Sequence, residues 1–215
     1  MPGSIGLVVI TMKSTDTTVR RTGRPLSFDR EQALEQAMLT FWRHGYETSS
    51  ISDLTAAMGI TAPSLYTAYG DKKQLFLEAM RLYAGSPYDM EQALVEAPTS
   101  RDAAQRMLIA AAEAFTGELT PRGCLLASAT ASGSGASADV QSEVAQVRRE
   151  IQSRLQNRID RDVAQALLPV GTDSHSLATL VIALIQGMSV LARDGTDRRD
   201  LLAMANFAMN AWPKL

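Results

Sequence analysis

Residues 40–80 read TFWRHGYETSSISDLTAAMGITAPSLYTAYGDKKQLFLEAM, and they contain several helix caps and glycines at short, regular intervals. Ser50 can cap a short helix that ends at Gly59, and Thr61 can cap a second helix that ends at Gly70. A hydroxyl side chain caps a helix because its oxygen accepts a hydrogen bond from a free N–H of the first turn. Two short helices joined by a three-residue turn with a glycine form a helix-turn-helix.

The helical spacing of apolar residues continues on both sides of this unit. Upstream, the apolar residues over 34–41 predict a helix that Ser27 caps and that ends at Gly45. Downstream, Asp71 would cap a longer helix over 71–84. The sequence therefore predicts a small helical N-terminal domain with a core of its own.

The rest of the chain has longer, alanine-rich segments and no strand-like alternation. We expect helices near 88–97, 100–118, 123–131, 139–168, 174–193 and 197–212. The predicted fold is all-α, with an N-terminal arm over 1–24, a three-helix helix-turn-helix domain over 25–85 and a larger helical domain over 86–215.

Charge is unevenly distributed, although the whole chain has a net charge of only −2. Residues 13–30 hold five lysines and arginines against two aspartates, so the rest of the chain is acidic. A basic arm on an acidic body is an asymmetry that a nucleic-acid-binding protein can use. A solvated basic tail without any partner has the same composition, so charge alone leaves both interpretations open.

Reactive side chains are few. Cys124 is the single cysteine, and His44 and His175 are the two histidines, so no internal disulfide can form and a catalytic cysteine has no clear histidine partner. We found no metal-ligand cluster, phosphate-binding loop or paired-carboxylate motif in the sequence. We therefore predict no enzymatic activity, no cofactor and no metal site, and the single cysteine suits a reducing cytoplasm.

The segment 177–191 is apolar almost all round, which suits either a membrane span or a fully buried helix. Gln186 and the flanking charges leave fewer than 18 uninterrupted apolar residues, which is short for a bilayer. We therefore expect a helix that is buried on all sides, and no association with a membrane.

The second helix of the helix-turn-helix would carry small or hydroxyl-bearing side chains that its core does not need. These residues are Thr61, Ala62, Pro63, Ser64, Tyr66 and Thr67. Their apolar groups can pack against a thymine methyl, and their hydroxyls can bond bases or phosphates. Lys72 would sit at a helix N-terminus, where the dipole disfavours a cation unless an anion such as phosphate is held there. A three-helix packing unit with a solvated lysine explains the same spacing.

Residues 40–80 also resemble the DNA-binding domain of the tetracycline-repressor (TetR) family. The matching residues are Phe41, Gly45-Tyr46, Thr48, Ile51, Leu54, Ala57, Gly59-Ile60, Ser64-Leu65-Tyr66, Tyr69, Lys72 and Leu75-Phe76. The resemblance covers about residues 20–85, because Gly23-Arg24-Pro25 suits the basic arm of many members. It implies a transcriptional regulator, usually a repressor, that binds a palindromic operator in double-stranded DNA as a homodimer.

By this resemblance, Ser64, Tyr66 and Thr67 would face the major groove or its rim, and Tyr66 and Lys72 would contact phosphates. The full set of predicted DNA-binding residues is Arg20, Arg21, Arg24, Thr48, Ser50, Thr61, Ala62, Pro63, Ser64, Tyr66, Thr67 and Lys72. Two departures stand out: many members have a Phe and then a polar residue at Tyr69-Gly70, and bulkier aromatic or His residues are common at Thr67-Ala68. The smaller groups here imply fewer phosphate or base contacts. The operator sequence therefore stays open.

The resemblance also implies a body that dimerises and binds an effector. The last two large helices would form a four-helix dimer interface, with the candidates Leu177, Val181, Leu184, Ile185, Leu201, Ala205, Met209 and Trp212. The helices over 100–168 would enclose a small apolar effector, with the candidate lining residues Met107, Phe115, Cys124, Leu125, Ile151, Leu155 and Met188. The effector would favour a spacing of the two DNA-binding domains that does not fit DNA.

Two alternatives to a ligand-responsive repressor stay open. Cys124 follows Gly123 near a predicted helix N-terminus, which would lower the pKa of the thiol and suit a thiol- or electrophile-sensing regulator. A helical interaction protein without DNA binding is the second alternative, and salt-sensitive DNA retention would exclude it. For a regulator we expect a cytoplasmic, nucleoid-associated location.

Overall fold

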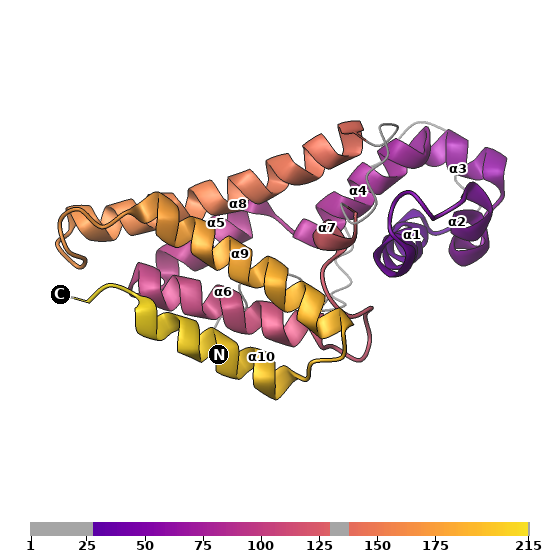
Figure 1. Ribbon diagram of the computed structural model, residues 1–215. Coiled ribbons are helices and arrows are strands. Elements are labelled where there is room, and N and C mark those ends of the chain that lie inside the picture. The colour runs from indigo at the N-terminus through magenta and orange to yellow at the C-terminus, as the bar shows by residue number, and fades with distance from the viewer. Residues whose placement is uncertain (1–27, 130–137, 215) are drawn as a thin grey trace.

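The computed structural model describes residues 28–129 and 138–214, which form helices without strands. The head holds α1 (Arg30–His44), α2 (Ile51–Met58), α3 (Ala62–Tyr69) and α4 (Lys72–Ala84). The body holds α5 (Pro87–Glu96), α6 (Ser100–Phe115), α7 (Leu125–Ser128), α8 (Ala138–Ala164), α9 (Ser174–Arg193), α10 (Arg198–Ala208) and the 3₁₀ turn η2 (Met209–Ala211). The head lies at one end, and α4 runs from it to the body (Figure 1). The all-α prediction is confirmed.

The core of the head lies where α1 crosses α2 and α4. The rings of Phe41 and Phe76 pack edge to face with their centroids 5.1 Å apart, and Leu54 and Leu65 are fully buried beside them. Aromatic pairs of this geometry add to the stabilisation from buried apolar area. These contacts hold α1, α2, α3 and α4 together, and the core of the head continues into that of the body.

The start of α1 differs from the sequence prediction. The side chain of Asp29 accepts hydrogen bonds from the N–H groups of Glu31 and Gln32, so Asp29 is the N-cap. The prediction that Ser27 caps this helix is wrong, and Ser27 itself lies outside the described residues. A carboxylate at this position also interacts favourably with the helix dipole.

Three helices of the body end earlier than predicted. The helix expected over 100–118 ends at Phe115, because the loop turns back and the N–H of Gly123 donates to the carbonyl oxygen of Phe115 at 3.0 Å. The helix expected over 123–131 is only Leu125–Ser128. The helix expected over 139–168 ends at Ala164, and Ala166 adopts a left-handed conformation with a φ of +55°.

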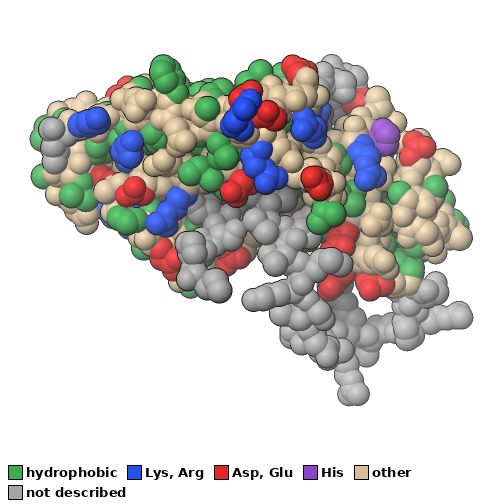
Figure 2. All heavy atoms as spheres, turned by 90° about the horizontal axis from the view of Figure 1, so that it is seen from below, with side chains coloured by type: hydrophobic (Ala, Val, Ile, Leu, Met, Phe, Trp, Pro, Cys, Tyr) green, Lys and Arg blue, Asp and Glu red, His purple; other side chains and the backbone are tan. Residues whose placement is uncertain are grey.

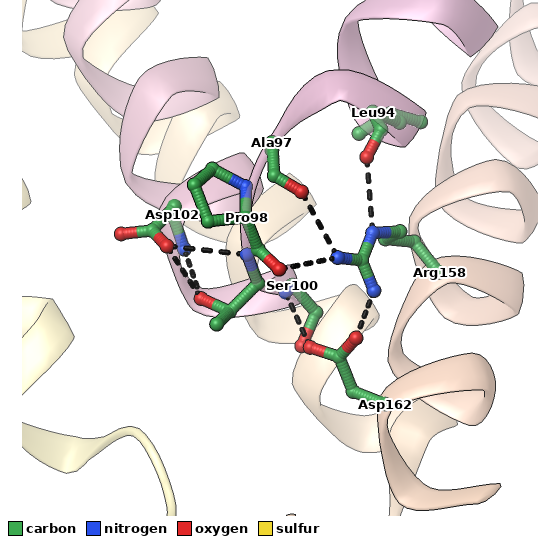
Figure 3. Close-up of polar contacts among 8 residues, drawn as sticks. Leu94, Ala97, Pro98, Ser100, Asp102, Arg158 and Asp162 are labelled. Carbon is green, nitrogen blue, oxygen red and sulfur yellow. Dashed lines mark hydrogen bonds and ion pairs between the residues drawn. The ribbon is translucent and has the colours of Figure 1, made fainter. Parts of the chain in front are cut away.

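A buried ion pair fixes the corner between α5 and α6 on α8 (Figure 3). Arg158 pairs with Asp162 one turn further along α8, and both side chains are almost fully buried. The guanidinium also donates to backbone carbonyls of the corner, including that of Leu94 at 3.0 Å, and the Asp162 carboxylate accepts from the N–H of Ser100 at 2.5 Å. Burial raises the pKa of Asp162, but these partners outweigh it and hold that pKa below its usual value.

The helix α9 packs on α6 and α8 with one side and exposes the other. By length and composition it is apolar enough to cross a membrane, and one third of its most apolar stretch is buried in the chain. Leu180, Val190 and Leu191 are exposed on it. The expectation of a helix buried on all sides is therefore wrong for a single chain, because one apolar face is left uncovered.

Candidate DNA-binding site and effector cavity

The turn between α2 and α3 is set by one glycine and two caps. Gly59 has a φ of +67° and a ψ of 28°, a left-handed conformation that glycine adopts without steric cost. Ser50 Oγ accepts from the N–H of Asp53 at 3.1 Å, while the Asp53 carboxylate accepts from the N–H of Ser50 at 3.0 Å. Thr61 Oγ1 accepts from the N–H of Ser64 at 3.3 Å and starts α3. The predicted helix-turn-helix is therefore present.

The helix α3 buries one face and exposes the other. Leu65 and Tyr69 are buried in the core of the head. Six predicted DNA-binding residues lie on the rest of its surface or at its cap: Thr61, Pro63, Tyr66 and Thr67 are exposed, and Ala62 and Ser64 are half-buried. Tyr66 keeps 50% of its surface exposed. The structure thus brings these six residues together on the outer side of the head.

The hydroxyl groups of this surface bond one another and the helix backbone. Thr61 Oγ1 and Ser64 Oγ lie 2.9 Å apart and share one hydrogen bond. The Thr67 hydroxyl donates to the carbonyl oxygen of Pro63 at 2.8 Å, one turn earlier in α3. These bonds orient the side chains before any partner arrives.

Two further predicted contacts flank α3 at the start of α2. Thr48 and Ser50 are both exposed there. The Thr48 hydroxyl donates to the carbonyl oxygen of His44, and the Ser50 hydroxyl donates to Asp53 at 2.6 Å. Their position next to a helix N-terminus suits contact with an anion such as phosphate.

Lys72 is braced against the head instead of extending into solvent. Its Nζ donates to the carbonyl oxygen of Glu47 at 3.3 Å and lies 4.6 Å from the centroid of the Tyr46 ring. Partial burial lowers the pKa of Lys72. An ammonium group has three protons, so the bond to Glu47 leaves others for a phosphate.

Sequence reasoning missed the contacts that hold the end of α3. The Tyr69 hydroxyl donates to the carbonyl oxygen of Arg30 at 2.7 Å, and the Arg30 guanidinium lies 4.5 Å from the centroid of the Tyr69 ring. Arg30 also pairs with Glu78 of α4 at 2.6 Å. These residues are 39 and 48 positions apart from Arg30 in sequence, so no local pattern could reveal the contacts.

The head is not a basic surface by itself. Residues 28–85 hold five lysines and arginines against seven aspartates and glutamates. On the face seen in Figure 2, acidic and basic side chains are scattered and do not gather in one basic patch. The predicted contacts Arg20, Arg21 and Arg24 belong to the arm, which lies outside the described residues.

A joint between head and body forms around Trp42, near the end of α1. Its Nε1 donates to the carbonyl oxygen of Gly123 at 3.2 Å, and its ring meets that of Tyr83 edge to face at 4.8 Å. Its own carbonyl oxygen accepts from Ser128 at 3.4 Å and from Arg193 of α9 at 3.5 Å. A shift of α9 or of the loop before α7 would therefore change the contacts of Trp42 and displace α1.

Cys124 is part of this joint, and its thiol is buried. It is almost fully buried, and its Sγ accepts from the Tyr83 hydroxyl at 3.2 Å. Burial raises the pKa of the Cys124 thiol, although hydrogen bonds and the charge of Arg193 oppose this. The prediction of a lowered pKa is wrong, because the following helix α7 has only four residues and desolvation outweighs its effect.

A cavity with a volume of about 380 Å³ lies where α4 meets α5, against α8. Its lining combines apolar and charged side chains and includes Met80, Met90, Val147, Ile151, Arg81, Glu150 and Arg154. Such a volume suits a small organic ligand. Because α4 forms one wall, a ligand here would contact the helix that links the rest of the head to the body.

The predicted pocket residues do not gather in that cavity. Ile151 lines it, and Ile151 and Cys124 line a smaller cavity of about 30 Å³ beside Tyr83. The other candidates are fully buried in the core of the body: Met107, Phe115, Leu125, Leu155 and Met188. Apolar spacing indicated that these residues face inward, but it could not separate a cavity wall from close-packed core.

The predicted dimer residues lie mainly on the inward side of their helices. Six of them are buried within the chain: Val181, Ile185, Leu201, Ala205, Met209 and Trp212. Leu177 and Leu184 are half-buried. The exposed apolar residues of the same helices are instead Leu180, Val190, Leu191 and Phe207. The sequence prediction assigns the more regular apolar stripe to the interface, whereas the chain uses that stripe for its own core.

Comparison with known proteins shows relatives for both parts of the chain. The family model "Bacterial regulatory proteins, tetR family" matches residues 33–79, and "Tetracyclin repressor-like, C-terminal domain" matches residues 103–205. The HTH-type transcriptional repressor ComR of Escherichia coli (strain K12) is 33% identical over 205 residues, which cover 94% of this chain and 97% of ComR. The HTH-type transcriptional regulator YezE of Bacillus subtilis (strain 168) is 38% identical over 78 residues, 36% of this chain and 40% of YezE.

Solved structures agree with this result. A cysteine mutant of the TetR family transcriptional regulator CifR, complexed with 26bp double-strand operator DNA, is 38% identical and has a TM-score of 0.84. The similarity covers 89% of this chain and all of the CifR chain. Head, body and connecting helix thus match this fold together, and the chain belongs to the TetR family of transcriptional regulators.

Proposed function

We propose that this regulator is a repressor that binds a palindromic operator as a homodimer and releases it when a small, largely apolar effector binds. The observation that carries the proposal is the outward face of α3. Six exposed or half-buried residues lie on this face or at its cap, within a complete helix-turn-helix. In such motifs the second helix enters the major groove. The 38% identical CifR, whose structure contains operator DNA, supports the same use of this face.

Dimerisation is supported by the uncovered apolar face of the body. Leu180, Val190 and Leu191 of α9 and Phe207 of α10 are exposed, and Phe207 has 78% of its surface exposed. Exposed apolar residues on two neighbouring helices are expected at a protein interface. A second copy bound there would add a second head, and a palindromic operator offers two half-sites about 34–36 Å apart for the pair.

The N-terminal arm would supply most of the attraction to DNA. The head over 28–85 has more acidic than basic side chains, so its contacts alone cannot neutralise many phosphates. Arg20, Arg21 and Arg24 lie just before it in the chain. We infer that these arginines follow the DNA backbone while α3 lies in the groove.

The effector would act at the cavity between α4, α5 and α8. A ligand wedged between Met80 of α4 and Val147 of α8 would favour one position of α4 over another. Because α4 carries the head, a ligand that prefers the position unfit for DNA lowers operator affinity by its differential affinity for the two states. The salt bridge from Lys73 to Asp139, at 2.9 Å, couples the same two helices nearer to the DNA.

Selection of operators from random double-stranded DNA tests the first part of the proposal. We expect palindromic sequences with salt-sensitive binding, and the Tyr66→Phe variant should bind all of them several-fold more weakly, because its hydroxyl contacts phosphate. Selection of no sequence, or binding that salt does not affect, would contradict DNA binding.

A library of small apolar compounds, added to the operator complex, tests the second part. The Val147→Trp variant fills the cavity and should bind operator without being released by any compound that releases the parent protein. Leu119→Trp is the matched control, because Leu119 is 94% exposed and does not line the cavity. Release of both variants alike would place the effector elsewhere.

A further inference from the structure

The side chains of α3 limit the kind of base edge that this helix can recognise. Its exposed residues are Pro63, Tyr66 and Thr67, and the cap Thr61 precedes them. From Ala62 to Tyr69 the helix, which is described in full, contains no Arg, Lys, Asn or Gln. Guanine is usually read by a bidentate Arg or Lys, and adenine by a bidentate Asn or Gln. Neither kind of readout is therefore available from α3.

Two hydroxyl protons of α3 and its cap are already used within the protein. The Thr67 proton is committed to the Pro63 carbonyl oxygen at 2.8 Å. Thr61 Oγ1 and Ser64 Oγ, 2.9 Å apart, share one hydrogen bond, which uses one of their two hydroxyl protons, and Thr61 Oγ1 also accepts from the N–H of Ser64. Breaking these bonds to donate to a base would exchange one hydrogen bond for another with little net gain.

The apolar groups of the same residues are free to make contacts. Because the Thr67 hydroxyl points back at the helix backbone, its methyl group is the outward part of this exposed side chain. The exposed Pro63 ring lies one turn before it, at the i, i+4 spacing that places two side chains about 5–6 Å apart on one face. Together they form a small apolar surface at the front of the helix.

In the major groove, the C5-methyl of thymine is the apolar group that base edges present. We propose that α3 selects operators by packing Pro63 and Thr67 against thymine C5-methyl groups in each half-site. This inference rests on the proposed function, since it assumes that α3 enters the major groove. It makes Pro63 and Thr67 the specificity-determining residues and assigns phosphate contacts to Tyr66, Lys72 and the arm.

The test replaces thymine by deoxyuridine, one position at a time, in an operator selected from random DNA. Deoxyuridine keeps every hydrogen-bonding group of thymine and removes only the methyl. At one or two thymines of each half-site we expect about four-fold weaker binding per methyl removed, the effect of exposing one buried carbon group. Affinity that stays equal at every thymine would overturn the proposal.

A protein variant identifies the residue that makes the contact. Thr67→Ser removes the side-chain methyl and keeps the hydroxyl bond to Pro63, so it should bind thymine and deoxyuridine operators equally at the position that Thr67 faces. Thr55→Ser is the matched control, because the Thr55 hydroxyl makes the same backward bond, to Ile51 at 2.9 Å, in α2. Thr55→Ser should keep the four-fold preference, and loss of the preference in both variants would contradict the assignment.

Failure of this inference and failure of the proposed function give different results. If the protein selects an operator and binds it in a salt-sensitive way, but without discrimination between thymine and deoxyuridine, DNA binding stands and methyl readout is excluded. If no operator is selected at all, the proposed function itself fails. Selected half-sites without any thymine would also overturn the inference.

Discussion

The head and the body differ in the apolar residues that they leave exposed. In the head, Tyr66 and Leu82 are the exposed large hydrophobic residues among those described, and Tyr66 belongs to the proposed DNA surface. In the body, α9 and α10 alone leave Leu180, Val190, Leu191 and Phe207 exposed. The head thus leaves little apolar surface exposed outside the proposed DNA surface, whereas the body leaves an apolar surface on α9 and α10 that the proposed dimer would cover. The difference matches the proposed roles, in which the head contacts DNA and the body forms the dimer.

The two regions also differ in the ion pairs that fix their helices. Arg30 and Glu78 join α1 to α4 in the head with about a third of each side chain exposed. Arg158 and Asp162 join the α5–α6 corner to α8 in the body with almost no exposure. A buried pair is costly to break because the remaining charge is left without a partner in a poor solvent for ions. The body should therefore tolerate changes to its ion pair much less than the head.

The largest expected effect is the loss of Arg158. The Arg158→Ala variant should lose about 3–5 kcal/mol of unfolding free energy, since it leaves the Asp162 carboxylate buried and unpaired. Arg30→Ala, the matched change in the head, should lose about 1 kcal/mol or less, because water screens that pair. Urea unfolding followed by tryptophan fluorescence measures both, and equal losses would contradict the comparison.

The second effect concerns the uncovered face of the body. A charge on this face, in Phe207→Asp, should convert the proposed dimer to a monomer of 23.2 kDa in analytical ultracentrifugation. Operator affinity should fall by about 100-fold or more, because the second head is no longer tethered to the first. Leu119→Asp, at a still more exposed apolar residue in the loop before α7, is the control and should stay dimeric. A dimeric Phe207→Asp protein would show that the interface lies elsewhere.

A smaller effect is expected from the arm. Replacing Arg20, Arg21 and Arg24 by glutamine should lower the slope of log affinity against log salt concentration by about 2.7, or 0.9 for each lost phosphate contact. The preferred operator sequence should stay the same, because phosphate contacts carry no sequence information. An unchanged slope would mean that the acidic head binds DNA without help from the arm.

The smallest effect is expected at Cys124. The raised pKa of its thiol means that the reactive thiolate forms only at higher pH than for a free cysteine. Alkylation of the folded protein should therefore be much slower than that of the urea-unfolded protein, with a pH profile displaced upward. Cys124→Ala should keep operator affinity within about two-fold of the parent protein. Fast alkylation at neutral pH, with loss of DNA binding, would restore the thiol-sensing alternative.

Local interactions explain what the sequence alone predicted about this protein. The caps Ser50, Thr61 and Asp71 and the turn glycine Gly59 were all identified correctly, because each acts on N–H groups or dihedral angles within three residues of itself. The buried face of α3, with Leu65 and Tyr69, followed from helical spacing for the same reason. The helix-turn-helix and the all-α fold are therefore properties that the sequence determines by itself.

Contacts between distant segments decided the rest. The side of α9 and α10 that stays exposed depends on where α6 and α8 pack, and the cavity depends on how α4 and α5 meet α8. Likewise, Lys72 is braced by Tyr46 and Glu47, and Cys124 is desolvated by its neighbours from α4 and α9. Helical spacing predicts which face of a helix is apolar. The burial of that face and the pKa values of its groups depend on the other segments that cover it. These properties were therefore decided by the tertiary structure.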